Sequence, residues 1–270
     1  MKSIVITGSS SGIGKATAKH FAAQGWKVAA TMRKPENETE LNQLENVSLY
    51  ALDVTDEASI AEATQQILAD FGTVDVVLNN AGYSLSGAFE AATPEQIQRQ
   101  FDVNVFGLMN VTLAFLPHFR ANGAGLFLNV SSMGGQITFP FGSLYHGTKW
   151  AVEGFSESLS YELSGLGIQV KIIEPGVVST DFYGRSMVFS AKEGLTAYDE
   201  ILTKYQANTA NAQSSGSTPE QLAEAIYGAA TDGKAQLRYL IGPDAEQLLG
   251  LRKALGDDGY VAAITQQILS

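Results

Sequence analysis

The sequence predicts an α/β fold in which helices cover both faces of a doubly wound parallel sheet. Short apolar segments rich in β-branched residues recur along the chain without alternating with polar residues, as expected for strands buried on both faces. Amphipathic segments of helical period separate them and are long enough to cross over between parallel strands. The first apolar segment also runs directly into a glycine-rich turn and a helical pattern.

The expected strands follow one another through most of the chain. They cover residues 4–6, 27–31, 47–52, 74–78, 126–130 and 170–173, and the run 237–242 is expected to form a last strand. After residue 176 this regular alternation fades, and aromatic residues and a polar tract fill the segment 180–217. A segment of this length without regular structure is usually functional in a compact domain, so we expect it to form a lid.

Helix-start signals lie between the expected strands. Asp56 precedes a helical pattern that ends at Gly72, a residue suited to a helix C-cap. Thr93 and Thr218 are each followed by a proline and an acidic residue, the order typical of a capped first turn. Two helical segments are expected after residue 243. No linker interrupts the pattern, so residues 1–270 are expected to form one domain.

Composition and charge bear on several classes of function. A formal net charge of −11 over 270 residues argues against binding to a nucleic-acid backbone. The chain has no Cys and three His, which excludes disulfides and thiol nucleophiles and makes a metal site improbable. No apolar run approaches the roughly 20 residues of a membrane span, and the N-terminus enters its first strand at once, so a cytoplasmic protein without membrane contact is expected.

The glycine-rich turn has two interpretations. Residues 8–12 match the G-x-S-x-G nucleophile turn of serine hydrolases, but His20 lies within the helix after the turn, and His118 and His146 have no accompanying oxyanion-loop signature. Gly8, Gly12 and Gly14 also make a phosphate-binding loop, in which glycines allow the sharp turn, the close approach of a pyrophosphate and tight helix packing. The spacing differs from G-x-G-x-x-G, so the decision depends on the rest of the chain.

Tyr145 and Lys149 occur four residues apart in a helical pattern, which places both side chains on one face. An ammonium near a phenol favours the phenolate and so moves the phenol toward acid–base chemistry near neutral pH. Ser132 follows the strand at 126–130, where it can donate to a substrate carbonyl oxygen, and Ser131 is the competing choice. Asn104 lies in an apolar helical pattern, where a structural role is the simplest interpretation.

These segments together resemble a known family. The motifs "TGSSSGIG", "NNAG", Asn104, "SS" ending at Ser132, "YHGTK" and "EPGVVST" are similar, in order and over essentially the whole chain, to those of the classical short-chain dehydrogenases/reductases. The resemblance implies a Rossmann-type sheet of order 3-2-1-4-5-6-7 and a nicotinamide cofactor. It also implies a substrate that is a carbonyl compound or an alcohol, and association into homodimers or homotetramers.

The resemblance also implies the roles of the site residues. Tyr145 is the acid/base, Lys149 lowers its pKa and holds the nicotinamide ribose, Ser132 orients the carbonyl, and Asn104 fixes a water in the proton relay. The spacing of thirteen residues to Tyr145 favours Ser132 over Ser131. The candidate cofactor contacts are Gly8, Ser10, Ser11, Gly12, Ile13, Gly14, Arg33, Asp53, Val54, Asn80, Ala81, Gly82, Tyr145, Lys149, Pro175, Gly176, Val178 and Thr180.

The residues after the second strand favour NADP(H) over NAD(H). Thr31 and Met32 stand where an NAD enzyme of this fold carries an acidic residue, and Arg33 follows. A guanidinium suits a 2′-phosphate through its charge and its paired donors, although Arg33 can also be an ordinary surface charge. The family's other basic residue for NADP(H), immediately before the second glycine of the loop, is absent, because Ser11 stands at that position. This arrangement is similar to that of the estradiol 17-beta-dehydrogenase and retinol dehydrogenase branch.

The expected lid indicates an apolar substrate. It contains Phe182, Tyr183, Met187, Val188, Phe189, Tyr198 and Tyr205, and the opposite wall is expected to include Tyr83, Met133, Phe139 and Phe141. Aromatic residues that only fasten the lid to the body are an equal alternative. His146 is expected to have no catalytic role. A nicotinamide-binding sensor or scaffold is the alternative function, although it has no need for the complete Asn, Ser, Tyr and Lys set.

Overall fold

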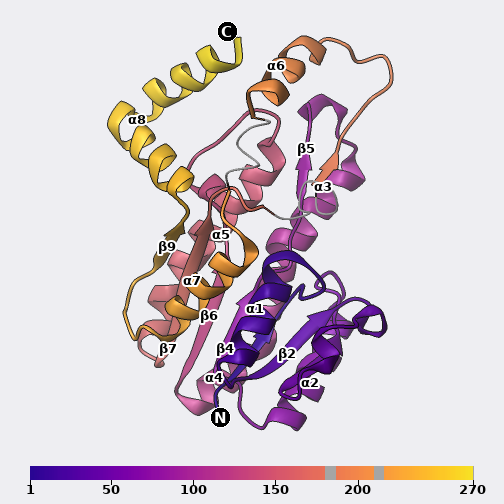
Figure 1. Ribbon diagram of the computed structural model, residues 1–270, viewed down its shortest axis with the longest axis vertical. Coiled ribbons are helices and arrows are strands. Elements are labelled where there is room, and N and C mark those ends of the chain that lie inside the picture. Colours follow the sequence, from indigo (N-terminus) through magenta and orange to yellow (C-terminus); the bar gives the residue numbers. More distant parts are fainter. Residues whose placement is uncertain (180–186, 210–215, 270) are drawn as a thin grey trace.

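A computed structural model describes residues 1–179, 187–209 and 216–269 of this chain (Figure 1). Within this part of the chain, seven parallel strands form one sheet in the order β3-β2-β1-β4-β6-β7-β9. The strands are β1 (Ser3–Ile6), β2 (Lys27–Met32), β3 (Val47–Ala51), β4 (Val76–Asn79), β6 (Gly125–Val130), β7 (Ile168–Pro175) and β9 (Arg238–Ile241). The expected doubly wound fold and its strand order are thus confirmed, with strand ends moved by a few residues.

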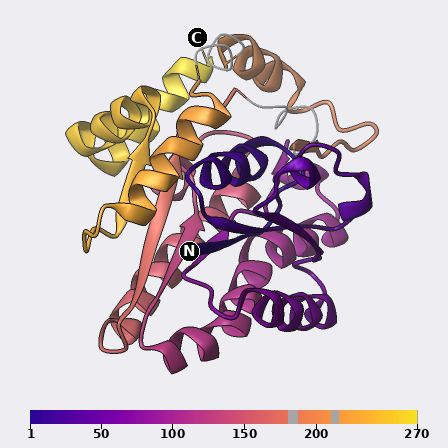
Figure 2. The ribbon, with the colours of Figure 1, turned by 60° about the horizontal axis from the view of Figure 1, so that its bottom comes forward.

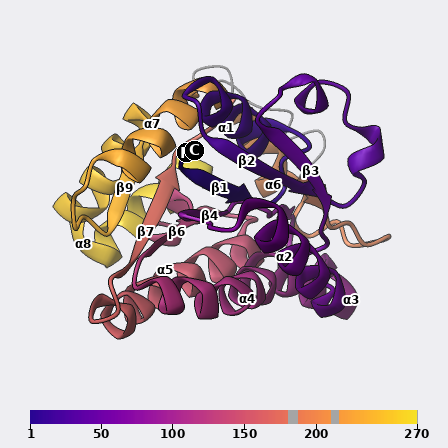
Figure 3. The same cartoon turned by 90° about the horizontal axis from the view of Figure 1, so that it is seen from below.

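Helices cover both faces of the sheet. They are α1 (Gly12–Ala23), α2 (Glu57–Phe71), α3 (Pro94–Phe101), α4 (Gly107–Asn122), α5 (Ser143–Ser164), α6 (Asp199–Thr209), α7 (Pro219–Thr231) and α8 (Pro243–Leu269). Figure 3 shows α1 and α7 on one face of the sheet and α2, α4 and α5 on the other. Each face carries its own apolar core, which explains why the strands read as continuous apolar runs.

The helix starts agree with the cap signals in the sequence. The Asp56 side chain accepts hydrogen bonds from the Ala58 and Ser59 N–H groups, and Gly72 follows α2 as its C-cap with φ +72°. Thr93 and Thr218 each form a capping box with the glutamine three residues on. These local signals act within one turn of chain, which is why the sequence alone was sufficient to find them.

The expected lid has more regular structure than its sequence indicated. Residues 187–189 form strand β8, which pairs in parallel with β5 (Ser84–Ser86), and α6 follows. Figures 1 and 2 show α6 and the end of α8 close together, beyond the carboxyl ends of the central strands. Expected lid residues 180–186 and 210–215 lie outside the described residues.

The last helix bends at Gly256, where φ is +69° and ψ is 177°. The two helical segments expected from the sequence correspond to the two sides of this bend. In the part of the chain that the structure describes, no helix is both long and apolar enough to cross a membrane.

Candidate active site

A cavity of about 1100 Å³ opens at the carboxyl ends of the central strands. In a doubly wound sheet this edge is where ligands bind. The sequence-predicted residues in its wall are Gly8, Ser10, Ser11, Gly12, Ile13, Arg33, Asp53, Val54, Asn80, Ala81, Gly82, Ser132, Tyr145, Lys149, Pro175, Gly176 and Val178. Gly14 and Asn104 are not part of that wall, and Thr180 lies outside the described residues. Segments distant in sequence therefore meet at one cavity.

The glycine loop between β1 and α1 is built for close contact. Gly8 has φ +71°, a conformation that side chains disfavour. A Cβ on Gly14 would lie 2.4 Å from the Gly8 carbonyl oxygen and 2.6 Å from Asn80 Nδ2. Gly14 thus lets the first turn of α1 pack against the loop itself. Gly12 and Ile13 at the start of α1 line the cavity, and the first N–H groups of a helix, which have no partner within the helix, can bind phosphate.

Asn80 and Thr7 join the end of β4 to this loop. Asn80 Nδ2 donates to the carbonyl oxygens of Thr7 at 2.9 Å and Gly8 at 3.2 Å. Thr7 Oγ1 in turn accepts from the backbone N–H groups of Asn80 at 2.9 Å and Ala81 at 3.0 Å. Asn80 therefore fixes the position of the glycine loop while it lines the cavity.

Ser132 stands at the end of β6, as the sequence indicated. Its Oγ accepts a hydrogen bond from the Gly134 N–H at 3.0 Å and donates to the Pro175 carbonyl oxygen at 3.5 Å. Ser131 also reaches the cavity wall, but its buried Oγ has no hydrogen-bond partner among the described residues. The 3.0 Å bond fixes the rotamer of Ser132, which orients its hydroxyl.

Tyr145 and Lys149 lie one turn apart on α5, with Lys149 Nζ 5.7 Å from the centre of the Tyr145 ring. Lys149 is 7% exposed, and its Nζ donates to the Val130 carbonyl oxygen at 2.8 Å. Burial lowers the pKa of the Lys149 ammonium to about 8, and the negative charge of Glu153 opposes that shift. An ammonium is therefore held beside a phenol in a mostly buried position.

Asn104 lies behind the cavity wall, in a π-helical turn (Asp102–Phe106) between α3 and α4. Its side chain accepts from the Tyr83 N–H at 3.0 Å and donates to the Tyr83 carbonyl oxygen at 2.9 Å. It also donates to Thr148 Oγ1 on α5 at 3.1 Å. Asn104 thus fastens the chain after β4 to the helix of Tyr145, the kind of structural role that the sequence suggested for it.

The three histidines all have structural contacts. His146 Nδ1 bonds the Gly134 carbonyl oxygen at 2.9 Å, and its Nε2 accepts from the Phe139 N–H at 3.0 Å. Burial lowers the pKa of His146, so the neutral ring that these bonds require is favoured. His20 packs on Tyr227, and His118 Nε2 accepts from the Val74 N–H. These contacts give the hydrolase interpretation no general base beside the glycine loop.

Arg33 and Asp53 lie at the end of the cavity formed by β2 and β3, with Arg33 exposed. Burial alone would raise the pKa of Asp53, but hydrogen bonds from Thr55 and the charges of Arg33 and Arg99 outweigh burial and lower it. Arg99, at the end of α3, also lines the cavity and was not found from the sequence. Two guanidinium groups therefore surround one carboxylate at this end.

The other end of the cavity is largely apolar. The residues expected there that line it are Tyr83, Met133, Phe139, Phe141, Met187, Val188, Phe189 and Tyr205. Tyr198 is not in the wall, because its hydroxyl donates to Glu90 at 3.0 Å, and Phe182 and Tyr183 lie outside the described residues. Phe141 has φ +59° and packs 5.6 Å from Tyr205 of α6. Residues of β8 and α6 thus line this end of the cavity together with residues of the body.

Several wall residues were not named from the sequence, although two of them lie within the expected lid, 180–217. Leu202 and Gln206 come from α6, and Leu248, Ile264 and Gln267 come from α8. The helical pattern of the last segment was visible in the sequence, but its position over the cavity depends on the bend at Gly256 and on tertiary packing. No local signal could have assigned these residues to the site.

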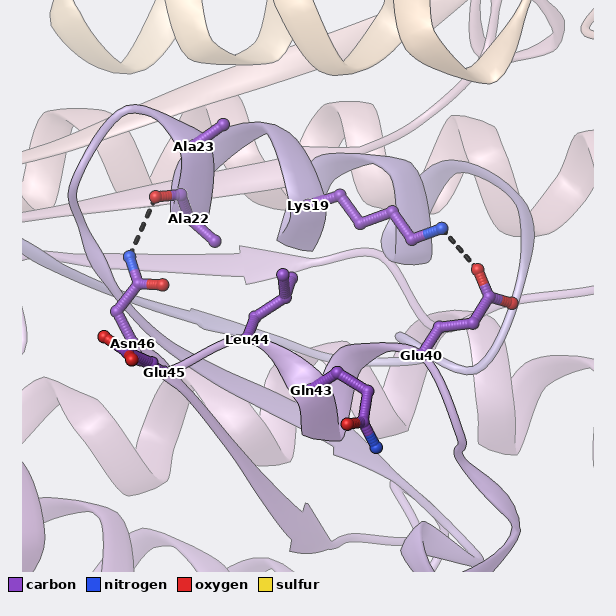
Figure 4. Close-up of a pocket in the computed structure, with 8 residues that line it drawn as sticks. All are labelled: Lys19, Ala22, Ala23, Glu40, Gln43, Leu44, Glu45 and Asn46. Carbon is purple, nitrogen blue, oxygen red and sulfur yellow. Dashed lines mark hydrogen bonds and ion pairs between the residues drawn. The ribbon is translucent and has the colours of Figure 1, made fainter.

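A second, shallower hollow lies between α1 and the turn Leu41–Gln43 (Figure 4). Two of its polar side chains are already paired, since Lys19 Nζ donates to Glu40 at 2.5 Å and Asn46 Nδ2 donates to the Ala22 carbonyl oxygen at 2.8 Å (Figure 4). We assign no function to it. Among the described residues, no group of three or more His, Asp or Glu side chains is arranged to hold a metal ion.

Comparisons with known proteins agree with this geometry. A family model described as short chain dehydrogenase matches residues 2–187. An uncharacterized oxidoreductase of Schizosaccharomyces pombe is 40% identical over 237 residues, which cover 88% of this chain and 99% of that protein. The 3-ketodihydrosphingosine reductase of Bacteroides thetaiotaomicron is 33% identical and covers 93% of this chain and 91% of its own length.

Solved structures show the same architecture. A short-chain dehydrogenase from Streptomyces avermitilis is similar with a TM-score of 0.83 and 35% identity, covering 98% of this chain and 96% of the other. The alcohol dehydrogenase of Thermococcus sibiricus, in complex with 5-hydroxy-NADP, is similar with a TM-score of 0.74 and 27% identity, covering 90% of this chain and 96% of the other.

Proposed function

The chain belongs to the short chain dehydrogenase family of oxidoreductases, and from that premise we propose that it transfers hydride between NADP(H) and an apolar carbonyl compound or secondary alcohol. One observation carries the proposal. Ser132, Tyr145 and Lys149 line the same cavity as the glycine loop, so the groups for proton transfer face the phosphate-binding turn.

The residues present fit a nicotinamide dinucleotide. A Cβ at Gly8 would lie 3.0 Å from the Ala81 Cα, and the glycine at this position keeps the loop free of a side chain where a pyrophosphate would approach. The N-terminus of α1 offers N–H donors for that pyrophosphate. Asp53 and Val54 form the adenosine end of the cavity and Lys149 the nicotinamide-ribose end, as the family resemblance implies. The bound nicotinamide supplies the hydride chemistry.

The protein's own residues align the carbonyl group and move the proton. Ser132 Oγ donates a hydrogen bond to the substrate oxygen, where negative charge develops during reduction. Tyr145 Oη gives its proton to that oxygen, and in the oxidative direction it removes the proton. The Lys149 ammonium favours the phenolate of Tyr145 and binds the ribose hydroxyls. Asn104 joins the proton relay from behind the wall, where it holds the chain after β4 against α5.

Arg33 supports the choice of NADP(H). It is exposed at the rim of the cavity beyond β2, and Thr31 and Met32 of that strand carry no carboxylate that would repel a 2′-phosphate. Asp53 is the acidic residue among the described residues of the wall, and the Thr55 N–H and hydroxyl donate to its Oδ1 at 3.0 and 2.8 Å.

The apolar end supports a bulky hydrophobic substrate. Phe139, Phe141 and Tyr205 form one part of the wall, and Met187, Val188 and Phe189 of β8 form another. Closing such a wall over the reacting carbonyl excludes water and strengthens the hydrogen bonds to it. The 3-ketodihydrosphingosine reductase relative is consistent with this class, since its name describes a ketone on a long apolar chain.

The test is consumption of NADPH and of NADH by the purified protein with a panel of apolar and polar carbonyl compounds. We expect faster turnover with NADPH, and with apolar ketones or aldehydes before charged ones. Much faster turnover of a charged polar substrate contradicts the substrate class. Binding of NADPH without turnover of any carbonyl compound contradicts the enzymatic function and favours a sensor or scaffold.

A further inference from the structure

A cluster of charged groups lies directly behind Lys149 and is not used in the mechanism above. Tyr145, Lys149, Glu153 and Glu157 follow one another at intervals of four residues and so form one stripe along α5. The first two line the cavity, and the last two bind Arg238 of β9. Arg238 Nε lies 2.9 Å from Glu153 Oε2, and its Nη2 lies 2.5 Å from Glu157 Oε2.

Glu174 of β7 completes the cluster. It is 1% exposed, its Oε1 accepts from Gln136 Nε2, and the same oxygen lies 3.4 Å from Arg238 Nε. Glu153 and Glu174 both contact Arg238 Nε, so their carboxyl groups lie close together. Two carboxylates this close and this buried cannot both be ionised without a large cost, so the pair shares a proton near neutral pH.

The proton belongs on Glu174. Glu153 has the shorter contact with Arg238, at 2.9 Å against 3.4 Å, so it is the better-stabilised anion. Burial, with the added charge of Glu153, raises the pKa of Glu174 to about 8. The resulting charges balance, because the cations Lys149 and Arg238 then face the anions Glu153 and Glu157. An ionised Glu174 would add a third carboxylate and leave the cluster with a net negative charge in a largely buried place.

Glu153 also lies close to the turn that follows Ser132. A Cβ built on Gly135 would lie 2.6 Å from Ser131 Oγ and 3.1 Å from Glu153 Oε1, so the Glu153 carboxylate lies directly behind the turn (Met133–Gly135) that follows Ser132. No protein donor reaches Glu153 Oε1 among the described residues, while Glu153 Oε2 and Glu174 Oε1 share Arg238 Nε as a partner. The carboxylate is therefore kept in place from β7, β9 and α5 at once.

We propose that Glu153 is a positioning residue for hydride transfer, in which its carboxylate keeps the buried Lys149 ammonium charged while Glu174 carries the proton of the acid pair. The role rests on the proposed function, since it acts through Lys149. The charged and titratable groups that face Glu153 are Lys149 and Glu157 from α5, Glu174 from β7 and Arg238 from β9. The turn at Met133–Gly135 adds none.

The variants Glu153→Gln, Glu153→Asp and Glu157→Gln test the proposal. Glu153→Gln removes the charge but keeps an acceptor for Arg238, and Glu153→Asp keeps the charge. Glu157→Gln is the matched control, because it removes a carboxylate that binds the same Arg238 but whose side chain is 40% exposed and lies two turns from Lys149. None of the three touches the wall of the cavity.

The direct measurement is an NMR titration of the Lys149 ammonium in protein with carbon-13 at the lysine Cε, with the signal assigned by its loss in Lys149→Arg. We expect Glu153→Gln to lower the titration midpoint by about one pH unit, and Glu157→Gln to leave it within about 0.3 unit. Glu153→Asp should restore most of the wild-type midpoint. An unchanged midpoint in Glu153→Gln, or an equal shift in Glu157→Gln, overturns the proposal.

Turnover provides the second measurement. The high-pH limb of the kcat/KM profile should move to lower pH by the same amount as the Lys149 midpoint, in Glu153→Gln only. A moved midpoint with an unmoved limb overturns the role of Glu153 in the reaction. A wild-type protein without turnover overturns the proposed function instead, and the NMR titration still decides whether Glu153 holds the ammonium.

Should Glu153→Gln fail to fold, the wild-type protein decides the question. With carbon-13 at the glutamate Cδ, we expect one buried carboxyl to titrate near pH 8, assigned to Glu174 by its loss in Glu174→Gln. The reverse assignment, with Glu153 carrying the proton, overturns the proposal.

Discussion

Lys149 Nζ lies 5.7 Å from the centre of the Tyr145 ring, one helical turn away on α5, and donates its 2.8 Å hydrogen bond to the Val130 carbonyl oxygen instead. This places the ammonium between the phenol and the end of β6, next to the segment that carries Ser132. The lysine is thus fixed by the backbone of the central sheet, so its distance from Tyr145 does not depend on a flexible surface side chain.

Ser132→Ala should lower kcat by about 100- to 1000-fold, because it removes a donor aimed at the oxygen where charge develops. Ser131→Ala is the control, since the neighbouring hydroxyl is buried without a hydrogen-bond partner among the described residues. It should change kcat by less than about threefold. Steady-state kinetics at saturating NADPH compare the two. Equal losses would mean that the assignment of the serine, based on its spacing to Tyr145, is wrong.

Arg33→Ala should weaken the use of NADPH selectively. A hydrogen bond to a charged group contributes about 1.5–3 kcal/mol, so kcat/KM for NADPH should fall by about 10- to 100-fold. The value for NADH should change little, because that cofactor has no 2′-phosphate. Lys34→Ala, next to it and also exposed, is the control. A parallel loss with both cofactors would assign Arg33 a structural role.

Gly14→Ala should destabilise the protein and weaken cofactor binding, because its Cβ would meet the Gly8 carbonyl oxygen at 2.4 Å. Overpacking of this kind costs about 1–3 kcal/mol. Gly154→Ala, inside α5 where a Cβ meets nothing within 4 Å, should instead stabilise by roughly 0.5–1 kcal/mol. Urea unfolding of both variants gives the two free energies. Opposite signs are expected, and a neutral Gly14→Ala would contradict the loop packing.

Glu174→Gln should alter how stability depends on pH. The folded pKa of Glu174 is raised to about 8 from 4.5, so the folded state binds the extra proton between these values. The stabilisation that this proton provides is therefore full below pH 4.5. It is lost as pH rises to about 8, and the free energy of unfolding falls by up to about 1.4 kcal/mol per pH unit in this range.

Free energies of unfolding at pH 5, 6, 7 and 8 test this. The wild type should lose more stability over that range than Glu174→Gln does. His146, whose pKa burial lowers, contributes an opposite slope, but it is common to both proteins and cancels in the difference. Glu157→Gln should keep the wild-type slope, since the pKa of Glu157 is lowered and titrates below this range. Parallel curves for wild type and Glu174→Gln would show that Glu174 is ionised when folded.

The sequence was sufficient for the central sheet and for most of the cavity wall. The sheet depends on local signals, since apolar runs mark strands buried on two faces and caps such as Asp56 mark helix starts, whereas the wall residues were assigned through the resemblance of the motifs to a known family. Strand β7 was predicted too short, because Glu174 ends the apolar run at 170–173, although Lys171 lies within that run. Their burial becomes acceptable only through partners distant in sequence, Asp232 for Lys171 and Gln136 for Glu174.

Features that depend on pairing between distant segments could not be predicted. Strands β5 and β8 have three residues each, too few for a recognisable period, and α6 has few apolar residues to mark one face. The acid pair of Glu153 and Glu174 joins a helix to a strand, and Arg238 approaches both from β9. Spacing along the chain carries no information about such contacts.

The most direct test of the proposed function pairs cofactor binding with turnover in Tyr145→Phe. Loss of the acid/base should lower kcat by about 100- to 10,000-fold with the best carbonyl substrate, while NADPH binding, measured by cofactor fluorescence, stays within about threefold of wild type. That result would support Tyr145 as the proton donor beside Lys149. Turnover close to wild type in Tyr145→Phe would contradict the proposed function at its centre.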